Sequence, residues 1–322
     1  MKKKVLLWVL TIMFIFCAFP AFAQITTTQS KSRFPEDFYR TSNITGRSIF
    51  LGDDTSGDSS QMRREVQQTR NFYIAKYEVT VSEWNRVIGS NRTNIQAGMQ
   101  FFNDGNMPMT GVTWYDAIEY CNRRSRMDGL TPAYTVSRRG RDITVTWNKS
   151  ANGWRLPTDH EWEIACRAGT TTRYHFGNSL STSQANINNS RNGPRAVGSY
   201  SANAWGLYDM HGNVWEWVWD WYDSFTTGDE WATPRRLGTL VDYSGPARKP
   251  ELDDRYLTDV GIYGDYRVIR GGSWAEREIF CTSATRMALQ ADHYSNDAPM
   301  LYARFYWGKN GIIGFRIARN AN

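Results

Sequence analysis

The sequence predicts a single domain in which three helices are set among short strands and irregular chain. Each helix is indicated by a threonine with an acidic residue three positions later, the capping-box arrangement that satisfies the first-turn amides. The three pairs are Thr80 with Glu83, Thr113 with Asp116, and Thr158 with Glu161. Apolar residues follow each pair at helical spacing. Because no stretch suggests a second core, we expect one domain, residues 46–322.

Short apolar runs bounded by glycine and polar residues predict the strands. They cover residues 49–51, 72–74, 133–136, 142–147, 267–270 and 311–316. The runs 133–136 and 142–147 are expected to pair as a hairpin, and Gly271-Gly272 predicts a tight bend or a close approach of two backbones. Residues 224–266 are rich in glycine and proline, which predicts a long ordered loop or an insertion.

Composition and charge narrow the class of protein. The chain has 322 residues, of which 41% are hydrophobic and 14% aromatic, including 14 tryptophans. A chain of this kind can bury a sizeable core without disulfide bonds. The formal charge is +6 and falls to +3 if the three lysines of the leader are removed (6 − 3). No basic stripe is present in the sequence, so a nucleic-acid partner is not expected.

The first residues are typical of an export signal. Lys2, Lys3 and Lys4 precede an apolar run from Val5 to Phe19, and Ala21-Phe22-Ala23 offers small residues at the cleavage site. We expect a signal peptide over residues 1–23, a polar linker over 24–45, and a secreted or surface-displayed mature protein with no transmembrane span. A lipid anchor at Cys17 is the alternative, although the bulky Phe16 precedes it.

Three cysteines remain after the leader: Cys121, Cys166 and Cys281. An odd number in an exported protein leaves at least one free thiol or an intermolecular bridge. Cys121 and Cys166 follow the apolar faces of two predicted helices, so they are expected to be buried thiols or a pair in the core. His160, in the first turn of the third helix, is expected to support the cap or face water rather than to take part in catalysis.

The stretch from Ala275 to Asn310 has an unusual composition. Its aromatic residues follow neither helical nor strand periodicity and are interleaved with small polar and charged residues. Binding surfaces use this mixture, because aromatic side chains provide contact area at a low entropic cost. An irregular loop whose aromatic side chains fold inward would have the same composition, and the residues alone do not separate the two interpretations.

A second candidate site lies in the loop 203–217, which bends at Gly212. Asp209 and Glu216, with nearby backbone carbonyls, could hold a hard cation such as calcium. The favoured alternative is that both acids cap turns and pair with arginine. His211 is expected to be structural. The sequence has no HExxH, GxSxG, phosphate-binding glycine loop or CxxC motif.

Six stretches, in order, resemble the formylglycine-generating enzyme (sulfatase-modifying factor) family. They are Phe72–Thr80, Gly111–Ala117, Trp154–Thr158 with Glu161–Glu163, Gly206–Trp217, Arg270–Trp274 and Gly314–Arg316. The resemblance implies an α+β fold of the C-type-lectin-like kind, with short mixed strands, few helices and much irregular chain. It also implies a structural calcium site formed by the side chains of Asp209 and Glu216 and the carbonyls of Gly212 and Val214.

The same resemblance bears on catalysis. The enzymes of this family bind copper through two cysteines five residues apart, and thiolates suit that metal. The second position matches Cys281, but the first is Glu276. Copper binding and oxidase activity are therefore not expected, and an oxidase acting on a substrate cysteine remains the alternative. The positions of the family's disulfide partners for Cys121 and Cys166 hold Ile317 and Arg286, so neither bridge is expected.

A non-enzymatic branch of this family resembles the chain more closely than the enzymes do. The variable proteins of diversity-generating retroelements, including a treponemal member, resemble this chain in the brackets Arg270–Trp274 and Gly314–Arg316. Between these brackets they carry hypervariable residues, rewritten by mutation at adenines, that bind a ligand. The branch implies a protein or cell-surface ligand here. The predicted ligand-binding residues are Ala275, Arg277, Phe280, Leu289, Asp292, His293, Tyr294, Tyr302, Arg304, Phe305, Tyr306 and Trp307. An inert surface protein, with no partner, is a third interpretation.

Overall fold

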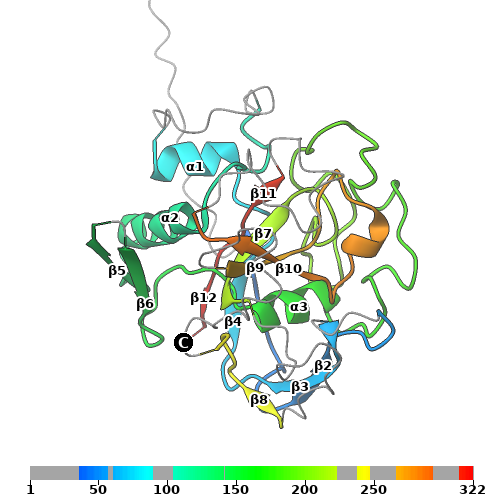
Figure 1. The fold of residues 1–322 in the computed structure, drawn as a ribbon, viewed down its shortest axis with the longest axis horizontal. Coiled ribbons are helices and arrows are strands. Elements are labelled where there is room, and N and C mark those ends of the chain that lie inside the picture. Colours follow the sequence, from blue (N-terminus) through cyan, green and yellow to red (C-terminus); the bar gives the residue numbers. More distant parts are fainter. Residues whose placement is uncertain are drawn as a thin grey trace, which may run out of the picture. The chain divides into compact units, whose positions relative to one another are not determined.

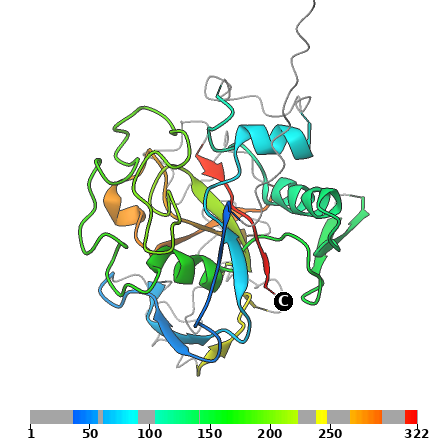
Figure 2. The ribbon, with the colours of Figure 1, turned by 180° about the vertical axis from the view of Figure 1, so that it is seen from behind.

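Four small sheets and three α-helices are formed by the residues described in the computed structural model, which are 36–56, 61–89, 104–140, 142–222, 238–246, 266–292 and 312–321. They belong to one unit that begins at Phe34. The leader, residues 24–35 of the expected linker, and residues 293–311 lie outside the described residues. Figures 1 and 2 show the arrangement from two opposite sides.

The central sheet has the strand order β10-β9-β7-β11 (Figure 1). Its strands are β7 (Trp215–Trp221), β9 (Tyr266–Arg270), β10 (Arg286–Gln290) and β11 (Ile313–Gly314). β7 and β10 are antiparallel to β9, whereas β11 is parallel to β7. A register shift in β7 between Trp217 and Trp221 marks a bulge. The prediction of a strand at 267–270 is confirmed, while the predicted strand at 311–316 is reduced to two residues.

A second sheet has the order β1-β4-β12 and joins the two ends of the described chain. Its strands are β1 (Phe38–Arg40), β4 (Phe72–Ala75) and β12 (Ala318–Asn320). Phe38 pairs with Ala75, and Ala318 pairs with Ile74 on the other side. The expected linker is therefore wrong at its C-terminal end, because residues 38–40 are a strand of the domain.

Two smaller sheets complete the strands. β2 (Ser48–Leu51), β3 (Arg64–Gln67) and β8 (Leu240–Val241) form one, and β5 (Tyr134–Arg139) and β6 (Asp142–Trp147) form the other. The predicted hairpin is thus confirmed and is longer in its first strand than expected. β8 shows that part of the predicted loop 224–266 contributes a strand, which pairs parallel with β3.

The three helices begin where the capping boxes predict. They are α1 (Val81–Val87), α2 (Trp114–Met127) and α3 (Asp159–Arg167). In each, the threonine hydroxyl accepts a hydrogen bond from the backbone amide of the acidic residue. The side-chain carboxylate of that acidic residue accepts one from the threonine amide. None of the described helices has the length and hydrophobicity that a bilayer crossing requires.

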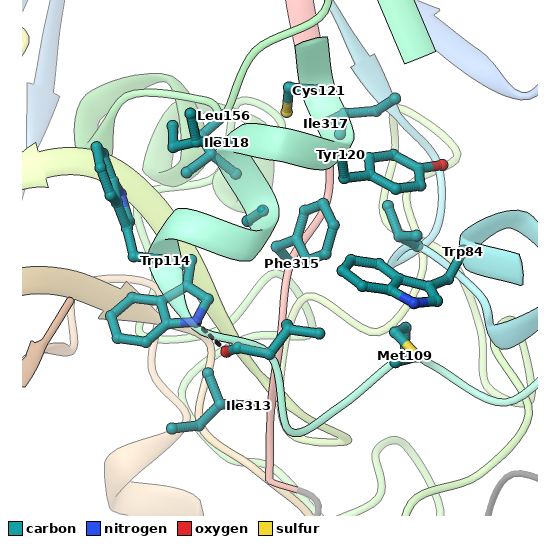
Figure 3. Close-up of a cluster of buried hydrophobic side chains, with 14 of the residues drawn as sticks. Trp84, Met109, Trp114, Ile118, Tyr120, Cys121, Leu156, Ile313, Phe315 and Ile317 are labelled. Atoms are coloured by element: carbon teal, nitrogen blue, oxygen red, sulfur yellow. Dashed lines mark hydrogen bonds between the residues drawn. The ribbon is translucent and has the colours of Figure 1, made fainter. Parts of the chain in front are cut away.

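The main core lies between α1, α2 and the central strands (Figure 3). Trp84 stacks on Tyr120 with ring centroids 5.7 Å apart, and Phe315 meets both rings edge-on. Cys121 belongs to this cluster, and all three cysteines of the domain are buried and free. The prediction of buried thiols is confirmed, and the alternative of a cysteine pair in the core is wrong.

Candidate functional site

The predicted binding stretch begins at a backbone crossing that requires glycine. Gly272 has a φ of +77°, and a Cβ atom there would lie 2.3 Å from the Sγ atom of Cys281. This confirms the close approach expected from the glycine pair. Trp274 follows, buried, and its amide donates to the carbonyl of Asn213 at 2.8 Å. The start of the stretch is therefore fixed to the loop that precedes β7.

Arg270, the last residue of β9, anchors the first bracket. Its guanidinium is fully buried and contacts the carboxylates of Asp159 and Glu163 on α3, the latter at 2.8 Å. It also donates to the carbonyls of Ser283 and Thr285 at 3.0 and 2.8 Å. These bonds connect α3, β9 and the chain leading into β10 in one network.

The acids of this network remain ionised. Burial by itself would raise the pKa of Glu163, but Arg64, Arg270 and Arg167 outweigh it and hold that pKa below its usual value. The pKa of Asp159 is lowered in the same way, because Arg270 and Arg286 outweigh its burial. Sequence reasoning assigned no role to Asp159, Glu163 or Arg270, although the acid-rich start of α3 was visible.

Arg316 anchors the second bracket through Glu216. Two guanidinium nitrogens of Arg316 donate to the two carboxylate oxygens of Glu216 at 2.7 and 2.8 Å. The indole nitrogen of Trp162 adds a bond at 2.9 Å. Arg316 also donates to the carbonyls of Ala75, Lys76 and Tyr208. Both carboxylate oxygens of Glu216 thus accept hydrogen bonds within the protein. Glu216 pairs with an arginine, as the alternative to calcium binding predicts.

Asp209 and Glu216, the two predicted side-chain ligands of calcium, both contact other groups of the protein. Glu216 faces a guanidinium, whose positive charge opposes a metal at the same oxygens. Asp209 accepts from the amide of Gly198 at 2.6 Å, and Gly212, with a φ of +81°, donates to the carbonyl of Gly271. Val214 is buried. Among the described residues, no group of three His, Cys, Asp or Glu side chains is placed to hold a metal.

Glu78 adds a further buried acid beside this loop. One of its carboxylate oxygens accepts from the side-chain amide of Asn213 at 3.1 Å. Burial and the nearby Asp209 raise the pKa of Glu78 well above its usual value. Burial also raises the pKa of Asp209, to about 6.

The residues at the family's copper positions do not fit copper. Cys281 is fully buried, and its thiol donates to the carbonyl of Arg277 at 3.6 Å. Burial raises the pKa of Cys281 well above its usual value, and the neighbouring Glu276 raises it further. Copper coordination requires thiolates. A single thiol beside a buried carboxyl group supplies only one of the two sulfur ligands.

A second thiol lies close to an imidazole. The Sγ atom of Cys166 is 3.8 Å from Nε2 of His211. That nitrogen accepts the amide of His175 at 3.1 Å, and Nδ1 faces the carbonyl of Cys281 at 2.7 Å. Burial lowers the pKa of His211 to about 3 and raises the pKa of Cys166 to about 12. The imidazole has no free nitrogen to accept the thiol proton, so the pair is structural.

The structure separates the predicted ligand-binding residues into three groups. Arg277 and Asp292 are exposed and Phe280 is half-buried, so these three can form part of a surface. Ala275 and Leu289 are buried in the main core, and their assignment to a binding face is wrong. The remaining predicted residues are His293, Tyr294, Tyr302, Arg304, Phe305, Tyr306 and Trp307, which lie outside the described residues.

Comparison with models of known protein families identifies the family of this chain. A model of the sulfatase-modifying factor enzyme 1-like domain matches residues 39–321. The chain belongs to this family. The match covers all three helices and both brackets, and it begins within β1. The expected α+β fold of the C-type-lectin-like kind is confirmed by the described elements and by the solved structures that share it.

Relatives in the sulfatase-modifying factor family have different activities. Chaperone protein LppX of Paenibacillus barcinonensis is 38% identical over 47% of this chain and 62% of its own length. The formylglycine-generating enzyme of Mus musculus is 27% identical over 76% of this chain and 56% of its own length. The chain spans less than two thirds of either relative. The solved structure of Treponema denticola variable protein 1 has a TM-score of 0.65 and 26% identity, covering 88% of this chain and 95% of that one.

Proposed function

We propose that this member of the sulfatase-modifying factor family is an exported or surface-displayed binding protein. Its ligand would be a protein or another cell-surface molecule, contacted by side chains between Trp274 and Gly311. The segment would be hypervariable, as in the variable proteins of diversity-generating retroelements. The similarity to Treponema denticola variable protein 1 over most of both chains supports this proposal.

The observation that carries the proposal is the way the two ends of the segment are held. Glu216 of β7 pairs with Arg270 of β9 on one side and with Gly314 of β11 on the other. Neighbouring strands lie about 4.8 Å apart, so the two brackets are fixed roughly 10 Å from each other. The intervening segment therefore begins and ends on one rigid sheet, which permits its surface residues to change while the framework stays folded.

The chemistry at Cys281 argues against the oxidase alternative. Glu276 stands where the family enzymes have their first copper-binding cysteine, so only the buried thiol of Cys281 remains at the two copper positions. We therefore propose that the chain does not catalyse formylglycine formation. A copper-loaded sample should consume no oxygen above background in the presence of a cysteine-containing peptide.

The proposal can be tested with two display libraries. In the first, Tyr294, Tyr302, Arg304, Phe305, Tyr306 and Trp307 are randomised together. In the control, six buried framework residues, Val268, Ile269, Leu289, Ala291, Ile313 and Phe315, are randomised. Because core truncations cost about 2–5 kcal/mol each, the control library should lose surface display.

The first library should retain the display level of the parent and should yield binders when sorted against a purified test protein. Loss of display as severe as in the control library would place the six residues in the core. Retained display with no binders from a library of adequate size would leave a folded protein with no adaptable face, which also contradicts the proposal.

A further inference from the structure

The hairpin of β5 and β6 presents an open strand edge beside α2 (Figure 1). It forms a two-stranded sheet, and β5 is exposed along its length after Tyr134. Strand edges expose a row of amide and carbonyl groups that can pair with another chain. The function proposed above makes no use of this hairpin.

Asn122 of α2 identifies which backbone groups face the open edge. Its side-chain amide donates to the carbonyl of Tyr134 at 2.9 Å and accepts from the amide of the same residue at 3.1 Å. The main-chain groups of Tyr134 therefore point away from β6. In an antiparallel pair this orientation recurs at every second residue, so the amide and carbonyl of Val136 and Arg138 point the same way.

Beyond Asn122 the edge has no partner within the described part of the chain. No described residue hydrogen-bonds to the outward amides and carbonyls of Val136 and Arg138. Asn122 thus makes the two hydrogen bonds to Tyr134 that a neighbouring strand would make. The outward backbone groups of Val136 and Arg138 are available to a strand from another chain.

A groove of about 790 Å³ separates α2 from this edge of β5. Tyr115, Ile118 and Val136 contribute apolar surface to its lining, and Val136 is 39% exposed. Arg123, Arg126 and Arg138 line it as well, against a single acid, Glu119, which pairs with Arg123 at 2.6 Å. The groove therefore carries an excess of positive charge from Arg126 and Arg138.

We propose that this groove binds an extended acidic polypeptide segment of a partner protein, which adds to β5 as a third strand. Such strand addition uses main-chain hydrogen bonds for affinity and alternate side chains for selectivity. Carboxylates on the groove-facing side of the added strand would meet Arg126 and Arg138. A polypeptide is favoured over a nucleic acid because the edge offers alternating donors and acceptors, which a phosphate backbone cannot match.

The proposal is tested by fluorescence anisotropy with a labelled octapeptide of alternating glutamate and valine. The full chain should bind this probe and should bind the matching lysine–valine peptide at least tenfold more weakly. A single-stranded oligonucleotide of equal charge should also bind at least tenfold more weakly. Equal binding of the oligonucleotide, or no binding of the acidic peptide, would overturn the proposal.

Two matched pairs of variants locate the site. Val136→Pro removes an outward amide on the β5 edge, and Ile143→Pro removes one on the β6 edge of the same hairpin. Arg138→Glu reverses a charge in the groove, whereas the adjacent Arg139→Glu does so outside it. The first member of each pair should weaken peptide binding at least tenfold, and the second should leave it within twofold.

Equal losses in both members of a pair would contradict strand addition at β5. Circular dichroism of each variant separates loss of binding from loss of folding. Self-association of the parent chain that is abolished by Val136→Pro would identify a second copy, and not an acidic partner, as the occupant, and would also overturn the proposal.

Discussion

Single buried ion pairs determine how firmly the two brackets are attached to the framework. Arg316 and Glu216 are both fully buried and share two hydrogen bonds. Removing one partner of such a pair leaves a charge without compensation in a site of low dielectric, which is much more costly than exchanging both partners for neutral groups.

Arg316→Met should lower the free energy of unfolding by about 3–5 kcal/mol, because Glu216 loses two of its three hydrogen bonds while it stays buried. Urea denaturation measures the change. Arg123→Met is the control, since its pair with Glu119 is exposed and should be worth about 1 kcal/mol or less. A loss of under 1 kcal/mol for Arg316→Met would mean that the carboxylate finds water or another partner.

His160 corrects the expectation that it caps α3 or faces water. It is fully buried and accepts a hydrogen bond from Arg64 at 2.9 Å. Burial, followed by the charge of Arg64, lowers its pKa to about 3. The folded state therefore binds the proton more weakly than the unfolded state does, so the stability that this residue confers is present above its unfolded pKa and is lost as the pH falls below it.

The difference in stability between the parent and His160→Gln should accordingly shrink on acidification. Between pH 7 and pH 5 the parent should lose roughly 2 kcal/mol more than the variant, from an unfolded pKa near 6.5 and 1.36 kcal/mol per pH unit. Urea denaturation at the two pH values provides the measurement. A parallel loss in both proteins would show that the imidazole is protonated in the folded state.

Among the elements, the helices were the most predictable from sequence. Thr80, Thr113 and Thr158 each begin a helix at the expected residue, because a capping box is a local signal that does not depend on tertiary contacts. The hairpin at β5 and β6 was predictable for a similar reason, since its alternating residues stand on both sides of a Gly140 turn.

β7 and β10 were missed for different reasons. The run Trp215–Trp221 has a tryptophan at every second residue, which is the period of a strand, but its first residues were assigned to the bent loop 203–217. In β10, Arg286 is buried and donates a hydrogen bond to Asp159. In the sequence alone, a charged residue such as this one suggests an exposed position. Ala275 and Leu289 were assigned to the binding face because they lie between the two brackets.

The loop before β7 yields a prediction about metal. Because Glu216 is neutralised by Arg316, addition of calcium or of EDTA should leave the melting temperature within about 1 °C of the metal-free value, since a ligand stabilises a fold only when it binds the native state. Differential scanning calorimetry tests this. A calcium-dependent rise that disappears in Asp209→Asn would contradict the account and would restore Asp209 as a ligand.

At the scale of the whole molecule, the described residues form a framework that holds both ends of the proposed variable segment. The framework consists of the central sheet, α3 and the buried network around Arg270, Glu216 and Arg316. The sequence revealed the fold because six motifs of this framework occur in order. It did not reveal where the framework ends and the surface begins, because that boundary depends on β10, whose burial is set by long-range contacts.

Sequencing the DNA downstream of the gene tests whether the segment between the two brackets is hypervariable. We expect a near-copy of the segment encoding Trp274 to Gly314, with a reverse transcriptase gene beside it. The copy should differ from the gene at adenines in codons for exposed residues such as Arg277 and Asp292, and should match it at the codons for the buried Ala275 and Leu289. Absence of such a copy, or differences concentrated in the buried codons, would contradict the account.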